Sequence, residues 1–219
     1  MMERREAERI LTGMKGAIFD LDGVIVDTAK YHFLAWRRLA AELGFNLTEV
    51  ENERLKGVSR MRSLEIVLEL AGITVSEEEK MALAEKKNRW YQEYIARMDE
   101  TEVLKGAREY LLRLRQDGVK TALASASKNA MAILEKTRLV PFFDAIVDGN
   151  EVVKAKPDPE IFLRAATKLS LPPVHCVVFE DAEAGVEAAR RAGMKVVGIG
   201  DKRTLGKADL IVKGLYELL

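Results

Sequence analysis

Two aspartates stand two positions apart where the first apolar run of the chain stops. Asp20 and Asp22 follow the run Gly16–Phe19, and Gly23 comes next, where it lets the backbone turn away. A short apolar run bounded by a turn predicts a buried strand, and two carboxylates at its end repel each other unless a cation or a bound proton separates their roles. The pair therefore indicates metal-assisted chemistry, in which one carboxylate is a ligand or nucleophile and the other an acid/base. The alternative is a pair of acidic turn residues that only cap a loop.

Polar residues also follow three later apolar runs of the chain. Ser125–Asn129 follows one run, Lys154 and Lys156 follow the next, and Glu180 and Asp181 follow a third. Four acids in one place demand a cation, and carboxylate oxygens suit Mg²⁺. Ser125–Asn129 leads into a predicted helix start, where backbone N–H groups and the helix dipole favour a phosphate. Together these features indicate phosphoryl transfer, and the absence of a Walker-type glycine loop argues against a nucleotide kinase.

The elements that must bring these residues together are predicted by the hydrophobic pattern. Apolar runs predict six strands, at 15–20, 119–125, 144–148, 175–180, 195–199 and 210–213. Amphipathic stretches after residue 104 predict helices at 106–116, 129–139, 158–169 and 182–191, the third opened by Asp158 as N-cap and Pro159 at the first helical position. Regular alternation of strand and helix predicts an α/β fold with a Rossmann-like parallel sheet covered on both faces. In such a sheet ligands bind beyond the carboxyl ends of the strands, where all the polar residues above would lie. Taken singly, each of them has an alternative as a helix cap, a turn residue or a solvated charge.

Residues 30–98 interrupt this alternation. Their pattern is helical throughout, at 31–43, 48–55, 60–71 and 76–98, which predicts an inserted all-helical second domain. The chain then crosses between the two parts near Val26–Ala29 and Asp99–Leu104, and two linkers allow a hinge over the strand ends. The expected division is a core of residues 14–29 and 99–219, a helical domain of residues 30–98, and an N-terminal extension of residues 1–13 with no assigned function.

Composition limits the other classes of function. Among 219 residues, 35 basic side chains balance 35 acidic ones, so no bulk field favours nucleic acid or an anionic membrane. No run reaches the roughly 18 apolar residues that a membrane helix needs, and the charged first 12 residues do not resemble a signal peptide. The single cysteine, Cys176, cannot form an internal disulfide, so a cytoplasmic location is expected. A monomer is the default expectation for the oligomeric state.

The order of these motifs is similar to that of the haloacid dehalogenase (HAD) superfamily. The matching residues are Asp20-x-Asp22-Gly23, then Ser125, then Lys156, then Glu180-Asp181, and the helical insert after the first strand matches the cap domain of the sugar-phosphate branch. Finer resemblance to the β-phosphoglucomutase branch lies in the segments Phe19–Ile25, Tyr31–Phe33, Leu55–Arg60 and Ala124–Asn129. The chain departs from the branch in its N-terminal extension and in Leu104-Lys105-Gly106, where relatives often have a proline before the glycine.

The resemblance implies a division of roles at the strand ends. Asp20 would attack a sugar phosphate and become an aspartyl phosphate, and Asp22 would be the general acid/base. One Mg²⁺ per chain would be held by Asp20, the Asp22 backbone carbonyl and Asp181, with Glu180 as a further candidate ligand. Lys156 would offset the repulsion between carboxylate and phosphate. Ser125 and the N–H of Ala126 would bind the transferring phosphate.

The resemblance also implies substrate contacts from the insert. The loop Lys56-Gly57-Val58-Ser59-Arg60 would lie over the site, and Arg60 could bind a distal phosphate bidentately, with Ser127, Lys128 and Asn129 meeting that phosphate from the core. His32 and Lys87 would help to position Asp22 and the sugar hydroxyls. The remaining candidates, with bland alternatives as hinge, helix-surface or packing residues, are Thr28, Trp36 and Ser63.

Three functions were compared on this basis. The first is a mutase that interconverts β-D-glucose 1-phosphate and D-glucose 6-phosphate, with β-glucose 1,6-bisphosphate as priming donor and intermediate. The second is a Mg-dependent HAD phosphatase of a small sugar or polyol phosphate, and the third is a catalytically idle sugar-phosphate sensor. The intact acids and Lys156 weigh against the sensor, and the two-sided distal-phosphate site favours the mutase. The sugar itself is fixed only by the resemblance.

Overall fold

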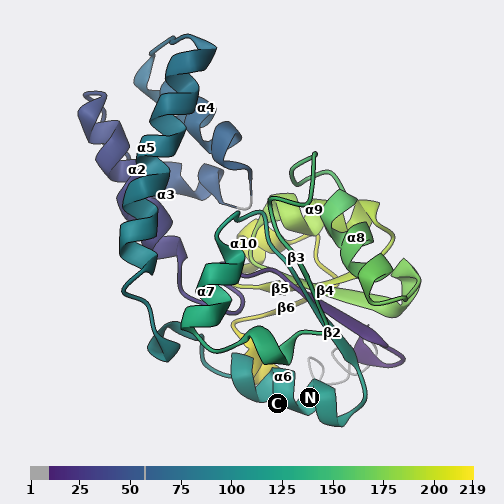
Figure 1. Cartoon of the computed structure of the whole chain (residues 1–219). Coiled ribbons are helices and arrows are strands. Elements are labelled where there is room, and N and C mark those ends of the chain that lie inside the picture. Colours follow the sequence, from purple (N-terminus) through teal and green to yellow (C-terminus); the bar gives the residue numbers. More distant parts are fainter. Residues whose placement is uncertain (1–9, 57) are drawn as a thin grey trace.

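A six-stranded parallel sheet forms the centre of the molecule (Figure 1). A computed structural model of the chain describes residues 10–56 and 58–219. The strand order is β3-β2-β1-β4-β5-β6, and every neighbouring pair is parallel. The strands are β1 (Gly16–Phe19), β2 (Lys120–Ala124), β3 (Ala145–Val147), β4 (Cys176–Glu180), β5 (Lys195–Ile199) and β6 (Leu210–Val212). The predicted strands and the α/β parallel-sheet fold are therefore confirmed.

Helices cover both faces of the sheet, because alternate residues of each strand point to opposite sides. On one face, Ile18 packs in a cluster with Phe162 of α8 and Val186 of α9. On the other, Phe19 packs in a cluster with Tyr110 of α6 and Ile133 of α7. These helices are α6 (Ala107–Gln116), α7 (Ala130–Lys136), α8 (Glu160–Lys168) and α9 (Glu183–Arg191). The shorter elements are α10 (Lys202–Leu205), η2 (Glu100–Glu102), η3 (Val140–Phe142), η4 (Pro173–His175) and η5 (Leu215–Leu218).

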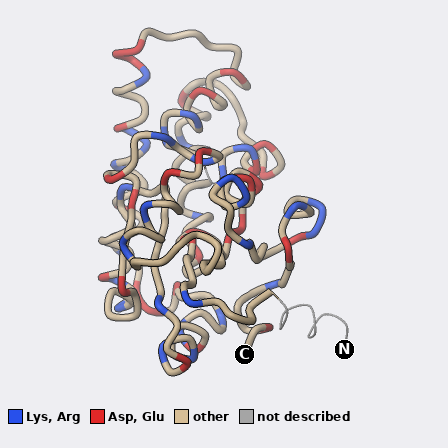
Figure 2. The backbone as a smooth tube through the Cα atoms, turned by 90° about the vertical axis from the view of Figure 1, so that its right-hand side faces the viewer, with Lys and Arg blue, Asp and Glu red and all other residues tan. Residues whose placement is uncertain are grey.

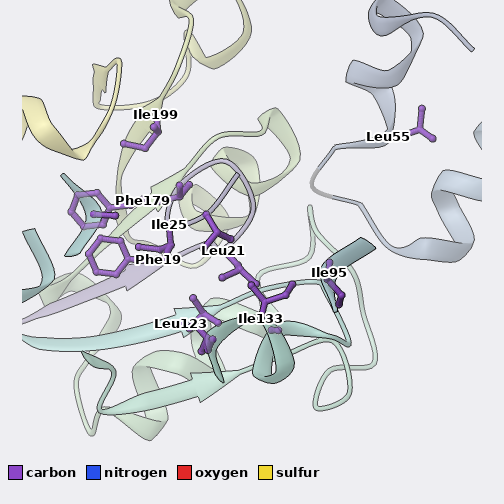
Figure 3. Close-up of a cluster of buried hydrophobic side chains, with 14 of the residues drawn as sticks. Phe19, Leu21, Ile25, Leu55, Ile95, Leu123, Ile133, Phe179 and Ile199 are labelled. Atoms are coloured by element: carbon purple, nitrogen blue, oxygen red, sulfur yellow. The ribbon is translucent and has the colours of Figure 1, made fainter. Parts of the chain in front are cut away.

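The end of β1 is held by aromatic packing. Phe19 is fully buried and stacks on Phe179 of β4, with ring centroids 4.5 Å apart. The Tyr110 ring packs edge-on against the Phe19 ring, with centroids 6.3 Å apart. Figure 3 shows Leu21 and Ile25 continuing this cluster past the end of the strand. Burial of a side chain of this size contributes about 1.5–3 kcal/mol, so the backbone that carries the first acidic pair stands on a well-packed base.

The described residues between 29 and 95 form helices joined by loops, with no strand, and we call this part of the chain the helical lobe. Figure 1 shows the lobe standing to one side of the sheet. Capping residues explain its helix boundaries: the Thr48 and Ser76 side chains form capping boxes, and Gly72 at φ 68° ends the third helix. The lobe contains α2 (Ala29–Glu42), α3 (Glu49–Asn52), η1 (Glu53–Leu55), α4 (Arg60–Ala71) and α5 (Glu77–Ile95).

The two chain segments that join the lobe to the sheet lie against each other. Val26 pairs with Val103 in an antiparallel bridge, and the Asp27 N–H donates to the Glu102 carbonyl at 2.9 Å. The Glu102 carboxylate accepts hydrogen bonds from Lys30 Nζ at 2.6 Å and from the Tyr31 hydroxyl at 2.5 Å. The entry and the exit of the lobe are thus tied together at one place.

Several predicted helix boundaries are wrong by two or three residues: the helix predicted at 31–43 begins at Ala29, and the helix predicted at 76–98 ends at Ile95. The helix predicted to end at Leu139 ends at Lys136, because Arg138 adopts a left-handed conformation with φ 55°. The helix predicted to begin at Asp158-Pro159 begins at Glu160, with Pro159 as its N-cap residue. The Asp158 side chain instead accepts the Glu160 N–H at 3.0 Å from outside the helix.

Charged residues of both signs are distributed over the described part of the molecule. Figure 2 shows basic and acidic residues interspersed along the coloured part of the trace. Among the described helices, none combines the length and the apolar character needed to cross a membrane.

Candidate active site

Two acidic pairs meet at the carboxyl ends of the two central strands. Asp20 and Asp22 follow β1, while Glu180 ends β4 and Asp181 follows it. From β1 the sheet grows to one side through β2 and to the other through β4, so this edge is the switch point where open α/β sheets bind ligands. Ligand oxygens of Asp20, Glu180 and Asp181 lie within 4.8 Å of one another.

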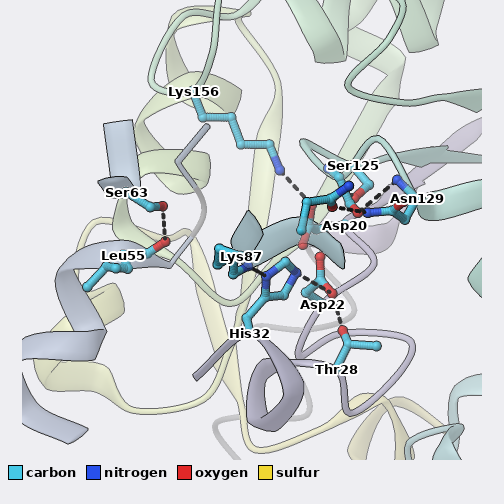
Figure 4. Close-up of polar contacts among 12 residues, drawn as sticks. Asp20, Asp22, Thr28, His32, Leu55, Ser63, Lys87, Ser125, Asn129 and Lys156 are labelled. Atoms are coloured by element: carbon cyan, nitrogen blue, oxygen red, sulfur yellow. Dashed lines mark hydrogen bonds and ion pairs between the residues drawn. The ribbon is translucent and has the colours of Figure 1, made fainter. Parts of the chain in front are cut away.

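Lys156 is the buried cation between these acids (Figure 4). Its Nζ lies 2.7 Å from Asp20 Oδ1 and 2.6 Å from Glu180 Oε1, and only 1% of its side chain is exposed. Burial alone would lower the pKa of Lys156, but the charges and hydrogen bonds of Asp20 and Glu180 outweigh it and raise that pKa. The ammonium therefore stays charged at neutral pH and faces whatever binds to Asp20.

The carboxyl groups of Asp20, Glu180 and Asp181 outnumber the one cation that contacts them among the described residues, Lys156. Burial, followed by the charge of Glu180, raises the pKa of Asp181 well above its ordinary value, and burial also raises the pKa of Glu180. Glu180 already uses both oxygens, one with Lys156 and one with the Ala182 N–H at 2.8 Å. An oxygen-rich, crowded carboxylate set of this kind fits Mg²⁺, and Asp20 and Asp181 are the side chains best able to hold it.

Two glycines make room for these acids. Gly23 has φ +77°, and a Cβ there would lie 2.2 Å from Asp181 Oδ2. A Cβ at Gly185, in the first turn of α9, would lie 1.8 Å from Glu180 Oε1. The local sequence thus lets both carboxylates of the second pair lie against neighbouring backbone.

Asp22 is contacted from the helical lobe and the hinge. The buried Thr28 hydroxyl donates to Asp22 Oδ1, and His32 Nε2 lies 3.9 Å from the same oxygen (Figure 4). Burial, with a further contribution from the charge of Asp20, raises the pKa of Asp22 to about 7. This carboxyl can therefore hold or release a proton near neutral pH, which the acid/base role requires.

His32 and Lys87 form a pair on facing helices of the lobe. Lys87 Nζ lies 2.9 Å from His32 Nδ1 and 4.5 Å from the centre of the Trp36 ring. Burial and the charge of Arg60 lower the pKa of Lys87 to about 7. The pKa of His32 is held well below its ordinary value by burial and then by Lys87. The structure thus places His32 of α2 beside Asp22 and Lys87 of α5 beside His32.

The loop after β2 is closed by its own hydroxyls. The buried Ser125 Oγ accepts the Ser127 N–H at 3.1 Å, and Ser127 Oγ accepts the Asn129 N–H at 3.2 Å. Ala126 is half-buried and Lys128 is exposed in the same loop. The Asn129 side chain points to the lobe, where it donates to Asn88 Oδ1 at 3.1 Å and accepts from Gln92 Nε2 at 3.2 Å. Asn129 thus joins the core to α5 as well as standing beside the predicted phosphate loop.

The predicted lobe loop has an ordered base. The Ser63 hydroxyl donates to the Leu55 carbonyl at 3.3 Å, and Ser59 Oγ caps α4 by accepting the Arg62 N–H at 3.2 Å. Lys56 pairs with an exposed glutamate of η1, and its charge partly opposes the rise in the pKa of Asp181. Burial lowers the pKa of Arg60. Val58 and Ser59 are half-buried, and Gly57 lies outside the described residues.

Sequence reasoning missed three polar residues of α5 that face this region: Asn88, Tyr91 and Gln92. Helical periodicity offered a signal, because Tyr91 lies four positions after Lys87 and Gln92 lies four positions after Asn88, so that each pair shares a side of the helix. The partner on the core side is a tertiary contact and has no counterpart in the periodicity.

Comparison with known proteins supports the same reading. The family model of haloacid dehalogenase-like hydrolases matches residues 14–193. The beta-phosphoglucomutase of Bacillus subtilis is 44% identical over 94% of this chain and 92% of that protein. A phosphorylated carbohydrates phosphatase of Thermotoga maritima is 36% identical over 90% of each chain. The crystal structure of a beta-phosphoglucomutase from Clostridium difficile superposes with a TM-score of 0.90 at 41% identity, over 94% of this chain and 93% of that one.

The predicted order of motifs, the parallel sheet with its helical insert and these matches agree with one another. The chain belongs to the haloacid dehalogenase-like hydrolase family.

Proposed function

We propose that this protein is a Mg-dependent phosphomutase that interconverts β-D-glucose 1-phosphate and D-glucose 6-phosphate. The observation that carries the proposal is the meeting of two parts at Asp22: the charges of Asp20 and Lys156 act on it from the core, and Thr28 and His32 approach it from the hinge and the lobe. A lobe that reaches the acid/base can exclude water from the site, which a mutase needs and a phosphatase does not. High identity to a relative named as a beta-phosphoglucomutase supports the same substrate.

Asp20 is the nucleophile of the proposed cycle. In the phosphorylated enzyme, the C6 hydroxyl of glucose 1-phosphate attacks the aspartyl phosphate while Asp22 takes its proton, which gives β-glucose 1,6-bisphosphate and free Asp20. After the bisphosphate turns round, Asp20 attacks the C1 phosphate, and Asp22 returns the proton to the leaving C1 oxygen. Glucose 6-phosphate leaves, and Asp20 is phosphorylated again.

The charges around Asp20 serve this transfer. Lys156 lies within hydrogen-bond distance of the nucleophile and offsets the repulsion between carboxylate and phosphate. Mg²⁺ bound by Asp20, Asp181 and the Asp22 backbone carbonyl would supply further positive charge for the phosphoryl oxygens. Ser125 and the Ala126 N–H hold the transferring phosphate, and Arg60, Ser127, Lys128 and Asn129 hold the distal one.

The proposal includes the wider organisation of the chain. Residues 14–29 and 99–219 form the core domain, and residues 30–98 form a cap domain that carries Lys56–Arg60, Ser63, Lys87 and Trp36 to the substrate. A cytoplasmic monomer fits one buried cysteine and balanced charge.

A phosphatase of small sugar phosphates is the second candidate, favoured by the Thermotoga relative. It would use the same Asp20 chemistry with water as the second acceptor. The two functions differ in the fate of the phosphate, so one assay separates them.

The test follows glucose 6-phosphate and inorganic phosphate separately, with β-glucose 1-phosphate, Mg²⁺ and a trace of the bisphosphate. Isomerisation with little phosphate release is expected, and phosphate release without isomerisation would establish the phosphatase. Asp20→Asn should abolish both reactions, and an active variant would overturn the assignment of the nucleophile. Arg60→Ala should impair isomerisation more than hydrolysis of the aspartyl phosphate, because only isomerisation needs the distal phosphate held.

A further inference from the structure

Tyr91 is a fixed aromatic residue at the seam between the lobe and the core. It lies on α5 and is only 1% exposed. Its ring stacks on His32, with centroids 4.0 Å apart and planes 22° apart, and Lys87 Nζ lies 4.9 Å from its centre. Two residues that converge on Asp22 therefore hold the Tyr91 ring in place.

The Tyr91 hydroxyl is buried and makes no hydrogen bond within residues 10–56 and 58–219. Its surroundings are nevertheless polar: burial and then the charge of Asp22 raise the pKa of Tyr91 well above its ordinary value, while the Ser127 and Thr28 hydroxyls, which are near enough to act on it as hydrogen-bonding groups without reaching hydrogen-bond geometry, lower it. The phenol oxygen thus faces a polar region between the acid/base residue and the loop after β2.

A buried hydroxyl without a partner costs free energy in the folded protein. Phenylalanine would keep the ring stack and remove that cost, so packing alone does not account for a tyrosine here. A ligand that enters the seam would give the hydroxyl its missing partner.

We propose that Tyr91 is a substrate-contacting specificity residue whose phenol hydrogen-bonds a ring hydroxyl of the bound hexose phosphate. The inference rests on the proposed function in taking a hexose phosphate as the substrate. Asp22 and Ser127 both act on the phenol: in the proposed function Asp22 exchanges a proton with a sugar oxygen, and Ser127 belongs to the distal-phosphate loop. The sugar ring joins these two points, and its hydroxyls donate and accept hydrogen bonds, as a phenol does.

Tyr91→Phe is the test, because it removes one oxygen and keeps the ring. The KM for the sugar phosphate should rise about tenfold, the size of one lost neutral hydrogen bond. The kcat should stay within about twofold, because the contact is made in both the ground and the transition state. Without ligand, the variant should melt at the same temperature as the wild type or higher. Tyr110→Phe, in another buried tyrosine of the core, should leave KM unchanged.

Deoxy substrates identify the partner. Among analogues that lack the hydroxyl at C2, C3 or C4, one should show the same KM with the wild type and with Tyr91→Phe, because the same hydrogen bond is lost from either side. An unchanged KM for the full substrate in Tyr91→Phe would overturn the proposal. A fall in kcat alone would also overturn it and assign Tyr91 to the positioning of His32. A lower melting temperature with unchanged KM would mean a purely structural hydroxyl.

Failure of the mutase proposal can be told apart from failure of this one. If the wild type releases phosphate without isomerisation, the KM for phosphate release still measures the Tyr91 contact.

Discussion

At the scale of single residues, folding moves the pKa of Asp22 into the neutral pH range, where an acid/base residue works. Its pKa rises from 3.8 to about 7 on folding, mainly because of burial. Between these two values the unfolded chain has lost the proton while the folded protein keeps it. Asp22 therefore lowers the stability of the metal-free protein progressively as pH rises from about 4 to about 7.

Asp22→Asn should remove this pH dependence, because an amide has no proton to lose in this range. With a chelator present, the variant should melt above the wild type at pH 8, and the difference should shrink towards pH 4. Thermal unfolding of both proteins across this range is the measurement. A difference that is the same at both ends would contradict the shift of the Asp22 pKa.

Gly23 makes a second residue-scale prediction, because it is strained for any side chain and also touches Asp181. Gly23→Ala should lose about 1 kcal/mol through its positive φ and should weaken Mg²⁺ binding further by displacing the Asp181 carboxylate, 2.2 Å from the new Cβ. Calorimetric Mg²⁺ titration measures the second effect.

Gly44 is the matched control, since it has the same φ of +77° and nothing within 4 Å of an added Cβ. Gly44→Ala should cost similar stability and leave Mg²⁺ affinity unchanged. Equal Mg²⁺ affinities for the two variants would mean that Asp181 does not need the space at Gly23.

At the scale of elements, the contact between α5 and the loop before α7 joins lobe and core. Asn129 is the N-cap residue of α7, yet its side chain makes no cap hydrogen bond and binds Asn88 and Gln92 instead. Those two residues are four apart and lie on one side of α5. These hydrogen bonds tie α5, the helix that carries Lys87, to the core.

Gln92→Glu tests this contact with little change of size, because a carboxylate cannot donate to Asn129 Oδ1. Loss of one neutral hydrogen bond corresponds to roughly 3- to 10-fold in the equilibrium between closed and open lobe. The ratio of phosphate release to isomerisation should rise by a similar factor as water enters. Glu93→Gln, at the exposed next position of α5, should leave the ratio unchanged. An unchanged ratio in Gln92→Glu would show that this contact does not hold the lobe.

Sequence patterns predicted the elements well where the pattern is local. Apolar runs placed all six strands to within one residue at each end, and the helical pattern placed the starts of α4 and α5 to within one residue. The end of α7 was missed because the left-handed residue that follows it, Arg138, is not one of the residues that usually adopt this conformation, glycine or asparagine. The partners of Asn129 and the stacking of Tyr91 on His32 were missed because they depend on how α5 packs, which no single helix encodes.

At the scale of the whole molecule, the sequence order of motifs became a spatial cluster through the strand order. Residues far apart in the chain, such as Asp20 and Lys156, lie 2.7 Å apart because β1 is central and the loop after β3 returns to it. Because the carboxyl ends of parallel strands meet at one edge of a sheet, these residues were predicted to share that edge. The strand arrangement alone does not predict that Glu180 is occupied at both oxygens by Lys156 and the Ala182 N–H.

The bridge between Val26 and Val103 has a consequence for how such proteins can change. Because the lobe leaves and re-enters the core at neighbouring points, it is an insertion whose first and last residues are adjacent in space. An inserted segment whose two ends lie this close together can change in length and shape without altering the order of the strands. Substrate specificity can therefore change through this insertion, while Asp20, Asp22 and Lys156 of the core are kept.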